Sequence, residues 1–132
     1  PGTFVYWDHS YSTAFPDMAF LPAALVISRV VSLVNETTLC LDLGHKAIAA
    51  ENALERRVHF LNEPGTSFIA QSEEHLVVSL PSTHTYKPGD VWYGVPFHVC
   101  PTCALYDTAP VIEKGLVKDE WQIKARSRKI SI

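Results

Sequence analysis

The sequence is poor in cysteine, has no long apolar run and carries no large excess of either charge. Its three cysteines are too few and too unevenly spaced for a disulfide framework, and they fit a reducing cytosol better. No apolar run reaches the ~18 residues of a membrane span, and no signal peptide is visible. A net charge of −3 provides no basic field for nucleic acid or an anionic membrane. We therefore expect a cytoplasmic protein with neither of these among its partners.

The chain is long enough for one domain. Its 132 residues, 47% of them hydrophobic, can bury a substantial core. No internal repeat, low-complexity tract or linker divides the sequence. It opens at Pro1 rather than at an initiator methionine, which suggests a fragment of something longer.

The apolar residues recur mostly with a period of two, which predicts strands. The predicted strands are residues 3–7, 23–34, 38–43, 75–80, 91–95, 104–113 and 116–130. One face of the second strand carries Leu25, Ile27, Val31 and Leu33. Only residues 46–57 could be helical, because of their alanine content. The fold class predicted is mainly all-β, a distorted antiparallel β-barrel or sandwich with at most one or two short helices.

Two turns and three tryptophans complete this prediction. Residues 87–90, Lys-Pro-Gly-Asp, are expected to turn the chain into strand 91–95, and Lys114-Gly115 to close a terminal hairpin. The side chains expected in the core are those of Trp7, Trp92 and Trp121.

The segment after strand 91–95 contains a histidine and a cysteine two positions apart. In an extended chain such residues point to the same face, so His98 and Cys100 could bind one ion. An imidazole and a thiolate suit Zn²⁺ best. Two ligands do not complete a tetrahedral site, which is typical of a catalytic rather than a structural metal.

Other interpretations of these cysteines stay open. Residues 100–103 form a C-x-x-C motif, which is known from redox proteins, but the predicted strand after it argues against the helix that such motifs need. A structural zinc knuckle of His98, Cys100 and Cys103 would need a fourth ligand from Cys40 or His45. Alternatively, Cys40 and Cys103 are buried as small apolar residues.

Four stretches, taken in order, resemble one known family. They are residues 42–47 (DLGHKA), 72–75 (SEEH), 96–102 (PFHVCPT) and 121–126 (WQIKAR). Together they are similar to the carboxy-terminal domain of the D-serine dehydratase and D-threonine aldolase family, over essentially the whole chain. The family is similar in architecture to alanine racemase, with an amino-terminal barrel that carries pyridoxal phosphate on a lysine and a distorted β-barrel after it.

The resemblance implies that residues 1–132 are the single carboxy-terminal β-domain of a larger lyase, whose cofactor-binding barrel is absent from this chain. It implies that His98 and Cys100 are the metal ligands. Cysteine at the second position is similar to the zinc-dependent dehydratases, whereas the aldolases typically have aspartate and use ions such as Mn²⁺. The expected partners are the amino-terminal pyridoxal-phosphate barrel of the same polypeptide, a second subunit in a homodimer, and a small 3-hydroxy-D-amino acid as substrate.

A metal on the substrate hydroxyl suits both water loss and retro-aldol cleavage, so the reaction stays open. This fragment alone is expected to be inactive. The competing hypothesis is a non-catalytic zinc-binding or subunit-association module.

Three further residues are candidates for catalytic roles. His75, beside Glu73 and Glu74, could be oriented by a carboxylate or lie on the surface. His45 follows a predicted strand end, a common functional location. Tyr93 could line the pocket or serve in packing. The lysine that binds the cofactor is expected in the missing barrel.

Overall fold

The computed structural model describes residues 3–127, whose regular secondary structure is mainly β-strand. The strands are β1 (Val26–Leu33), β2 (Thr38–Leu41), β3 (Val58–Phe60), β4 (Ser67–Gln71), β5 (Leu76–Ser79), β6 (Val91–Pro96), β7 (Thr108–Glu113) and β8 (Leu116–Gln122). The helices are α1 (Thr3–Tyr6), α2 (His9–Ala14) and α3 (Val99–Cys103), with 3-10 turns η1 (Leu54–Arg56) and η2 (Lys124–Ser127). The predicted all-β class is confirmed, although three short α-helices are present instead of two. None of the helices described is long and apolar enough to cross a membrane.

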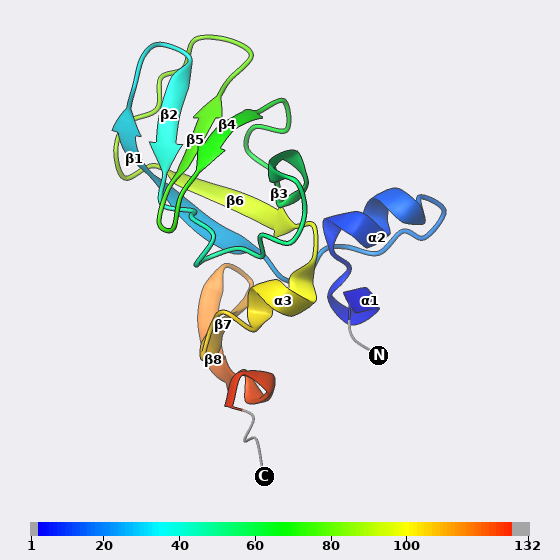
Figure 1. The fold of residues 1–132 in the computed structure, drawn as a ribbon. Coiled ribbons are helices and arrows are strands. Elements are labelled where there is room, and N and C mark those ends of the chain that lie inside the picture. The colour runs from blue at the N-terminus through cyan, green and yellow to red at the C-terminus, as the bar shows by residue number, and fades with distance from the viewer. Residues whose placement is uncertain (1–2, 128–132) are drawn as a thin grey trace.

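Six strands form one curled antiparallel sheet in the order β3-β6-β1-β2-β5-β4, and β7 and β8 form a separate hairpin (Figure 1). Strand β1 joins the two halves of the sheet, one formed with β6 and β3 and the other with β2, β5 and β4. Its residues 26–29 pair with β6 and its later residues with β2, with an irregularity between Val30 and Ser32. This break in the register bends the sheet into a half-barrel.

The curl encloses the core. It brings the edge strands β3 and β4 together, with the rings of Phe60 and Phe68 5.9 Å apart and nearly perpendicular. Trp92 on β6 is fully buried and lies edge-on to Phe60. The other core side chains are mainly Val26, Val30, Leu39, Leu41, Leu43, Ile48, Val58, Leu76, Val78 and Leu80.

The amino-terminal strand predicted over residues 3–7 is wrong, because this segment forms α1. A positive φ of 52° at Trp7 ends that helix, and Asp8 begins the next one by accepting a hydrogen bond from the amide of Tyr11. The indole of Trp7 is buried, as predicted, against the rings of Tyr11 and Phe20.

The helix predicted over residues 46–57 does not form as an α-helix, and only η1 is helical there. Ile48 is fully buried and the backbone of residues 45 and 46 bonds to the chain at residues 72 and 73. These tertiary contacts override the local propensity of the alanines. Strands β3 and β4, three and five residues long, were not predicted.

Several predicted strands are confirmed, but the predicted apolar face of the second one is exposed instead of buried. The predicted strands 23–34, 38–43, 75–80 and 91–95 correspond to β1, β2, β5 and β6. The apolar residues Leu25, Ile27, Val31 and Leu33 are all exposed, whereas Val26 and Val30 face the core. The hairpin turn at Lys114-Gly115 is confirmed, with positive φ at both residues. Trp121 was expected in the core and is 54% exposed, because β8 is exposed along its whole length. Residues 128–130 of the predicted last strand lie outside the described residues.

Candidate metal site on the helix after strand β6

His98 and Cys100 lie at the start of α3, not in an extended segment. His98 is the residue before the helix and has extended backbone angles, while Cys100 is the second helical residue. Pro101 is tolerated in this first turn because its missing amide hydrogen has no helical partner there. His98 and Cys100 therefore do not share one face of an extended strand, contrary to the prediction.

Both candidate ligands remain accessible, and each has a polar neighbour. The Nδ1 atom of His98 lies 2.8 Å from Oε1 of Glu51, and both side chains are a little over 40% exposed. The sulfur of Cys100, which is exposed, lies 3.0 Å from the hydroxyl of Thr3 on α1. The pair offers an imidazole nitrogen and a thiol, a donor set that fits Zn²⁺ with open positions for further ligands.

Thr102 fastens α3 to the loop that carries Glu51. Its buried hydroxyl donates to the carbonyl of His98 (2.9 Å) and accepts from the amide of Ala49 (3.2 Å). Three residues beyond α3, the hydroxyl of Tyr106 donates to the carbonyl of Ala47 (2.7 Å). The loop and the helix therefore form one hydrogen-bonded unit.

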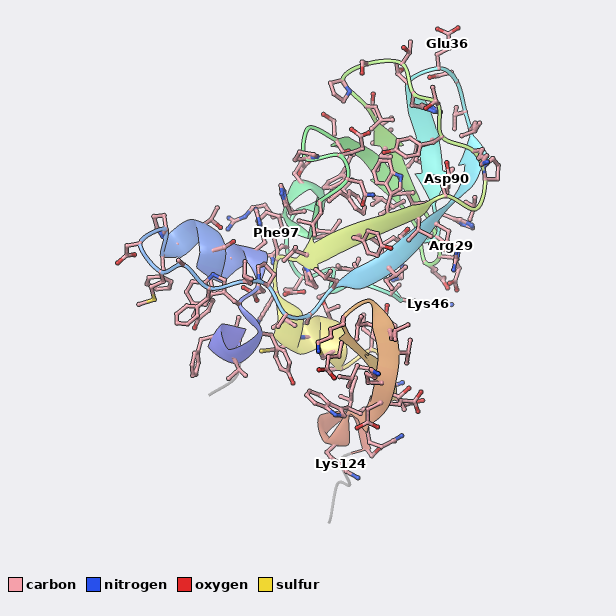
Figure 2. All side chains as sticks on the ribbon, turned by 180° about the vertical axis from the view of Figure 1, so that it is seen from behind. Arg29, Glu36, Lys46, Asp90, Phe97 and Lys124 are labelled. Atoms are coloured by element: carbon pink, nitrogen blue, oxygen red, sulfur yellow. The ribbon has the colours of Figure 1, made fainter. Side chains whose placement is uncertain are left out.

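Asp8 fixes the other side of α3. Its side chain is 2% exposed; one oxygen accepts from the amide of Tyr11 and the other from the amide of Val99, at 3.1 and 2.9 Å. One carboxylate thus caps two helices, with its charge at the positive end of both. Phe97, at the junction of β6 and the amino-terminal helices (Figure 2), accepts a hydrogen bond from the amide of Ser10.

Within residues 3–127, no group of three or more His, Cys, Asp or Glu is arranged to hold a metal ion. A closed zinc knuckle is therefore not formed there. The C-x-x-C motif does lie on a helix, contrary to the predicted strand, but this helix follows an antiparallel sheet instead of entering a βαβ unit. Burial raises the pKa of the Cys103 thiol, with a smaller contribution from Cys100, and so disfavours its thiolate.

A second, exposed cluster is formed by the two segments that carry His45 and His75. The amides of His45 and Lys46 donate to the carbonyls of Ser72 and Glu73, so two sequence-distant segments run side by side. The ammonium of Lys46 lies 2.8 Å from Glu73 and 2.9 Å from Glu74. The hydrogen bond to Lys46, and then its charge, lowers the pKa of Glu74. No hydrogen bond or ion pair among the described side chains joins this cluster to His98.

Tyr93 lies apart from both groups. It is on β6, paired with Ile27 of β1, and 43% of it is exposed on the outer side of the sheet. Its backbone is held by Asn62, whose side chain accepts from the Tyr93 amide at 2.7 Å.

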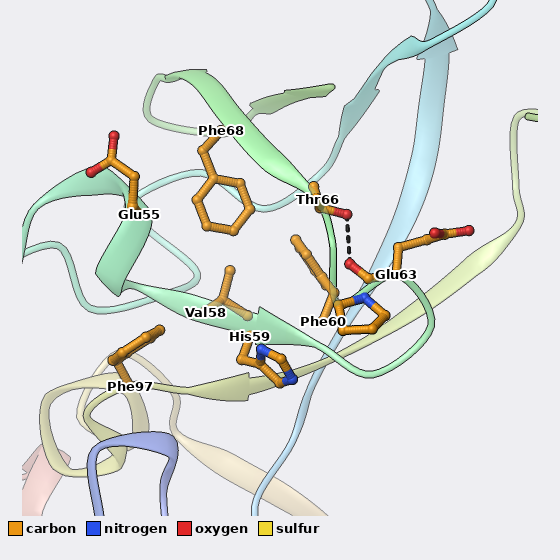
Figure 3. A pocket seen from close by; sticks show the side chains of 9 residues that line it. Glu55, Val58, His59, Phe60, Glu63, Thr66, Phe68 and Phe97 are labelled. Carbon is orange, nitrogen blue, oxygen red and sulfur yellow. Dashed lines mark hydrogen bonds between the residues drawn. The ribbon is translucent and has the colours of Figure 1, made fainter. Parts of the chain in front are cut away.

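A small cavity of about 110 Å³ opens between η1, β3 and β4 (Figure 3). Its lining residues are Glu55, Val58, His59, Phe60, Glu63, Pro64, Thr66, Phe68 and Phe97. Neither His98 nor Cys100 lines it, so the cavity and the candidate metal site are separate features.

Residues 23–112 match the family model described as "Putative serine dehydratase domain". The chain belongs to this family. It is 33% identical over 128 residues to a D-threonine aldolase from Arthrobacter sp., covering 95% of this chain and 33% of the relative. The chain thus spans about a third of the length of this curated relative.

Solved structures show the same fold. The D-threonine aldolase from Filomicrobium marinum is 25% identical with a TM-score of 0.83, over 96% of this chain and 34% of its own. The D-threo-3-hydroxyaspartate dehydratase from Delftia sp. is 16% identical with a TM-score of 0.67, over 91% of this chain and 37% of its own. Two variants of that dehydratase replace a cysteine (in a metal-free form) and a histidine two positions before it by alanine.

The sequence indicated His98 and Cys100 but not the residues around them. Glu51 is 47 positions from His98 in the chain, and Thr3 is 97 from Cys100. Glu51 fell in a segment predicted as helical, and Thr3 in one predicted as a strand. Only Asp8 had a local signal, since an aspartate before a short polar run favours a helix start.

Proposed function

We propose that this chain is the metal-binding carboxy-terminal β-domain of a larger pyridoxal-phosphate-dependent lyase that acts on 3-hydroxy-D-amino acids. The observation that carries the proposal is its membership of the serine dehydratase domain family, together with 33% identity to a D-threonine aldolase over nearly its whole length. Both the aldolase and the hydroxyaspartate dehydratase have names that imply a substrate with a hydroxyl at the β-carbon.

In this proposal His98 and Cys100 are the metal ligands. The donor set supports it, because an imidazole and a thiolate are the ligands that Zn²⁺ prefers and both side chains are accessible. The replaced histidine and cysteine of the Delftia dehydratase have the same order and spacing as this pair. A bound divalent ion would supply Lewis acidity to the substrate hydroxyl, while the pyridoxal phosphate of the larger enzyme would acidify the α-proton.

The chain's other candidates would act around that centre. His45 and His75 can exchange protons with a substrate group near the Lys46–Glu74 cluster, and Tyr93 can contact an adjoining domain from the outer face of the sheet. The expected partners are the amino-terminal pyridoxal-phosphate barrel of the same polypeptide and a second subunit of a homodimer. The enzyme is proposed to be cytoplasmic.

Metal titration of the 132-residue chain tests the ligand assignment. We expect Zn²⁺ to bind more weakly than at a four-ligand structural site, where binding supplies roughly 10–16 kcal/mol. Cys100→Ala and His98→Ala should abolish binding in isothermal titration calorimetry, whereas Cys40→Ala, on β2, should leave it unchanged. Cys100→Asp should shift the preference toward Mn²⁺. Unchanged zinc affinity in Cys100→Ala and His98→Ala would contradict the ligand assignment.

The reaction is tested in the full-length enzyme. With D-threonine and D-serine as substrates, glycine and an aldehyde indicate aldol cleavage, and a 2-oxo acid with ammonia indicates dehydration. Cys100→Ala should abolish either reaction while the absorbance of bound pyridoxal phosphate persists. A full-length enzyme that is inactive on both substrates, or a Cys100→Ala enzyme with normal turnover, would favour the non-catalytic module instead.

A further inference from the structure

The contact between Glu51 and His98 determines which ring nitrogen is free. An ionised carboxylate can only accept hydrogen bonds, so Oε1 of Glu51, 2.8 Å away, requires a hydrogen on Nδ1. In a neutral imidazole the lone pair then lies on Nε2. That nitrogen is therefore the one available to a metal.

The backbone around Glu51 is held in place by a buried side chain and by hydrogen bonds. Ile48, three residues before it, is fully buried in the core. The amide of Ala49 bonds to the hydroxyl of Thr102, which in turn donates to the carbonyl of His98. The same threonine thus fixes the backbone on both sides of the pair. This distinguishes the Glu51–His98 contact from a chance meeting of two exposed side chains.

We propose that Glu51 is a positioning residue of the metal site. Its carboxylate holds His98 in the Nδ1–H tautomer and so directs Nε2 toward the ion. This inference rests on the proposed function, because it takes His98 as a ligand. Carboxylate partners of ligating histidines typically raise metal affinity 10–100-fold. As an exposed pair, the contact contributes little to folding, so its loss should leave thermal stability nearly unchanged.

The experiment compares Glu51→Ala and Glu51→Gln with the matched control Glu36→Gln, which removes the same charge at the remote turn between β1 and β2 (Figure 2). The tautomer of His98 is measured by long-range ¹H–¹⁵N correlation in the metal-free chain, on the spectrum of the neutral ring. Zinc affinity is measured by competition with a chromophoric chelator.

We expect the wild-type chain and Glu36→Gln to show the Nδ1–H tautomer and equal zinc affinity. Glu51→Ala should lose that tautomer and bind zinc 10–100-fold more weakly. Glu51→Gln keeps an acceptor oxygen and should be intermediate. If Glu51→Ala leaves the tautomer and the zinc affinity unchanged while His98→Ala abolishes zinc binding, the proposed role of Glu51 is wrong. The assignment of His98 as a ligand would then still stand. Zinc affinity that survives His98→Ala would instead contradict the proposed function, and the tautomer would still decide whether Glu51 orients the ring.

Discussion

Gly44 is the residue at which the loop carrying His45 and Lys46 touches the segment carrying Glu73. A Cβ atom on Gly44 would lie 2.0 Å from the carbonyl oxygen of Glu73 and 2.2 Å from the amide nitrogen of Glu74. Both are backbone atoms, so no side-chain rotation can relieve the overlap. The absence of a side chain here allows the segments that carry the two candidate histidines to pack together.

Gly44→Ala should therefore separate the two segments. It should break the hydrogen bonds from the amides of His45 and Lys46, and overpack a buried contact. We expect the free energy of unfolding to fall by about 2–4 kcal/mol in urea titrations followed by tryptophan fluorescence. Gly65→Ala is the matched control, because its Cβ would meet Pro81 at an ordinary 3.5 Å. Equal midpoints for the two variants would refute this reading of Gly44.

At the same scale, the sequence predicted the candidate ligands but not their surroundings. His98 and Cys100 stand out because residue type and spacing are local properties. The partner of His98 is chosen by the tertiary structure, since Thr102 and Ile48 bring Glu51 to it from another part of the chain. No local pattern records such a contact.

Among the elements, the strands with clear alternation were predicted and the short helices were not. Burial alternates with a period of two along all of β2 and β5, over residues 26–31 of β1 and over residues 91–94 of β6. Helices α1 and α3 are only four and five residues long, less than two turns, so they show no helical periodicity. The start of α3 depends on the hydrogen bond from the amide of Val99 to Asp8 rather than on propensity.

Helix α2 is docked onto the sheet through stacked histidines. The centroids of the His9 and His59 rings are 4.3 Å apart and the rings are nearly parallel, whereas the Phe97 ring is steeply inclined to that of His9, with centroids 4.5 Å apart. Burial, and then the neighbouring His59, lowers the pKa of His9 below its ordinary value of 6.5, and Asp8 opposes this only in part. The folded chain thus favours neutral His9.

This contact should weaken in acid. Because the folded-state pKa is depressed, its stabilisation is fully present above about pH 6.5 and is lost as the pH falls toward the folded value. We expect the free energy of unfolding to decrease between pH 7.5 and 5.5, by no more than about 1.4 kcal/mol per pH unit from one proton. His9→Gln should flatten this slope, whereas His45→Gln, which removes an exposed imidazole, should retain it. A slope identical in all three chains would remove His9 as the cause.

As a whole, the molecule is a half-barrel with a large uncovered apolar surface. Leu25, just before β1, and Ile27 on its outer side are exposed, as are Val31 and Leu33 near its end, each more than 40% accessible. Tyr93 continues this surface on β6, opposite Ile27. The period of two correctly placed Leu25 and Ile27 on one face, but not that this face lies outside. The register break between Val30 and Ser32 pairs Leu33 with the buried Leu39, so the four apolar residues do not all share that face. Since the relatives are about three times as long as the chain, such a surface is suited to contact with another part of a larger enzyme.

The isolated chain should reveal that surface while remaining folded. We expect it to bind the dye ANS and to self-associate with rising concentration in sedimentation velocity, with a native near-ultraviolet dichroism spectrum that excludes a molten globule. Ile27→Thr, on the 57% exposed side chain, should reduce both effects with little change in unfolding free energy. Val30→Thr lies on the same strand but at a 1% exposed position, so it should lower the unfolding free energy by about 1–3 kcal/mol. A wild-type chain that binds no dye and stays monomeric would show that the outer face of β1 is not an interface.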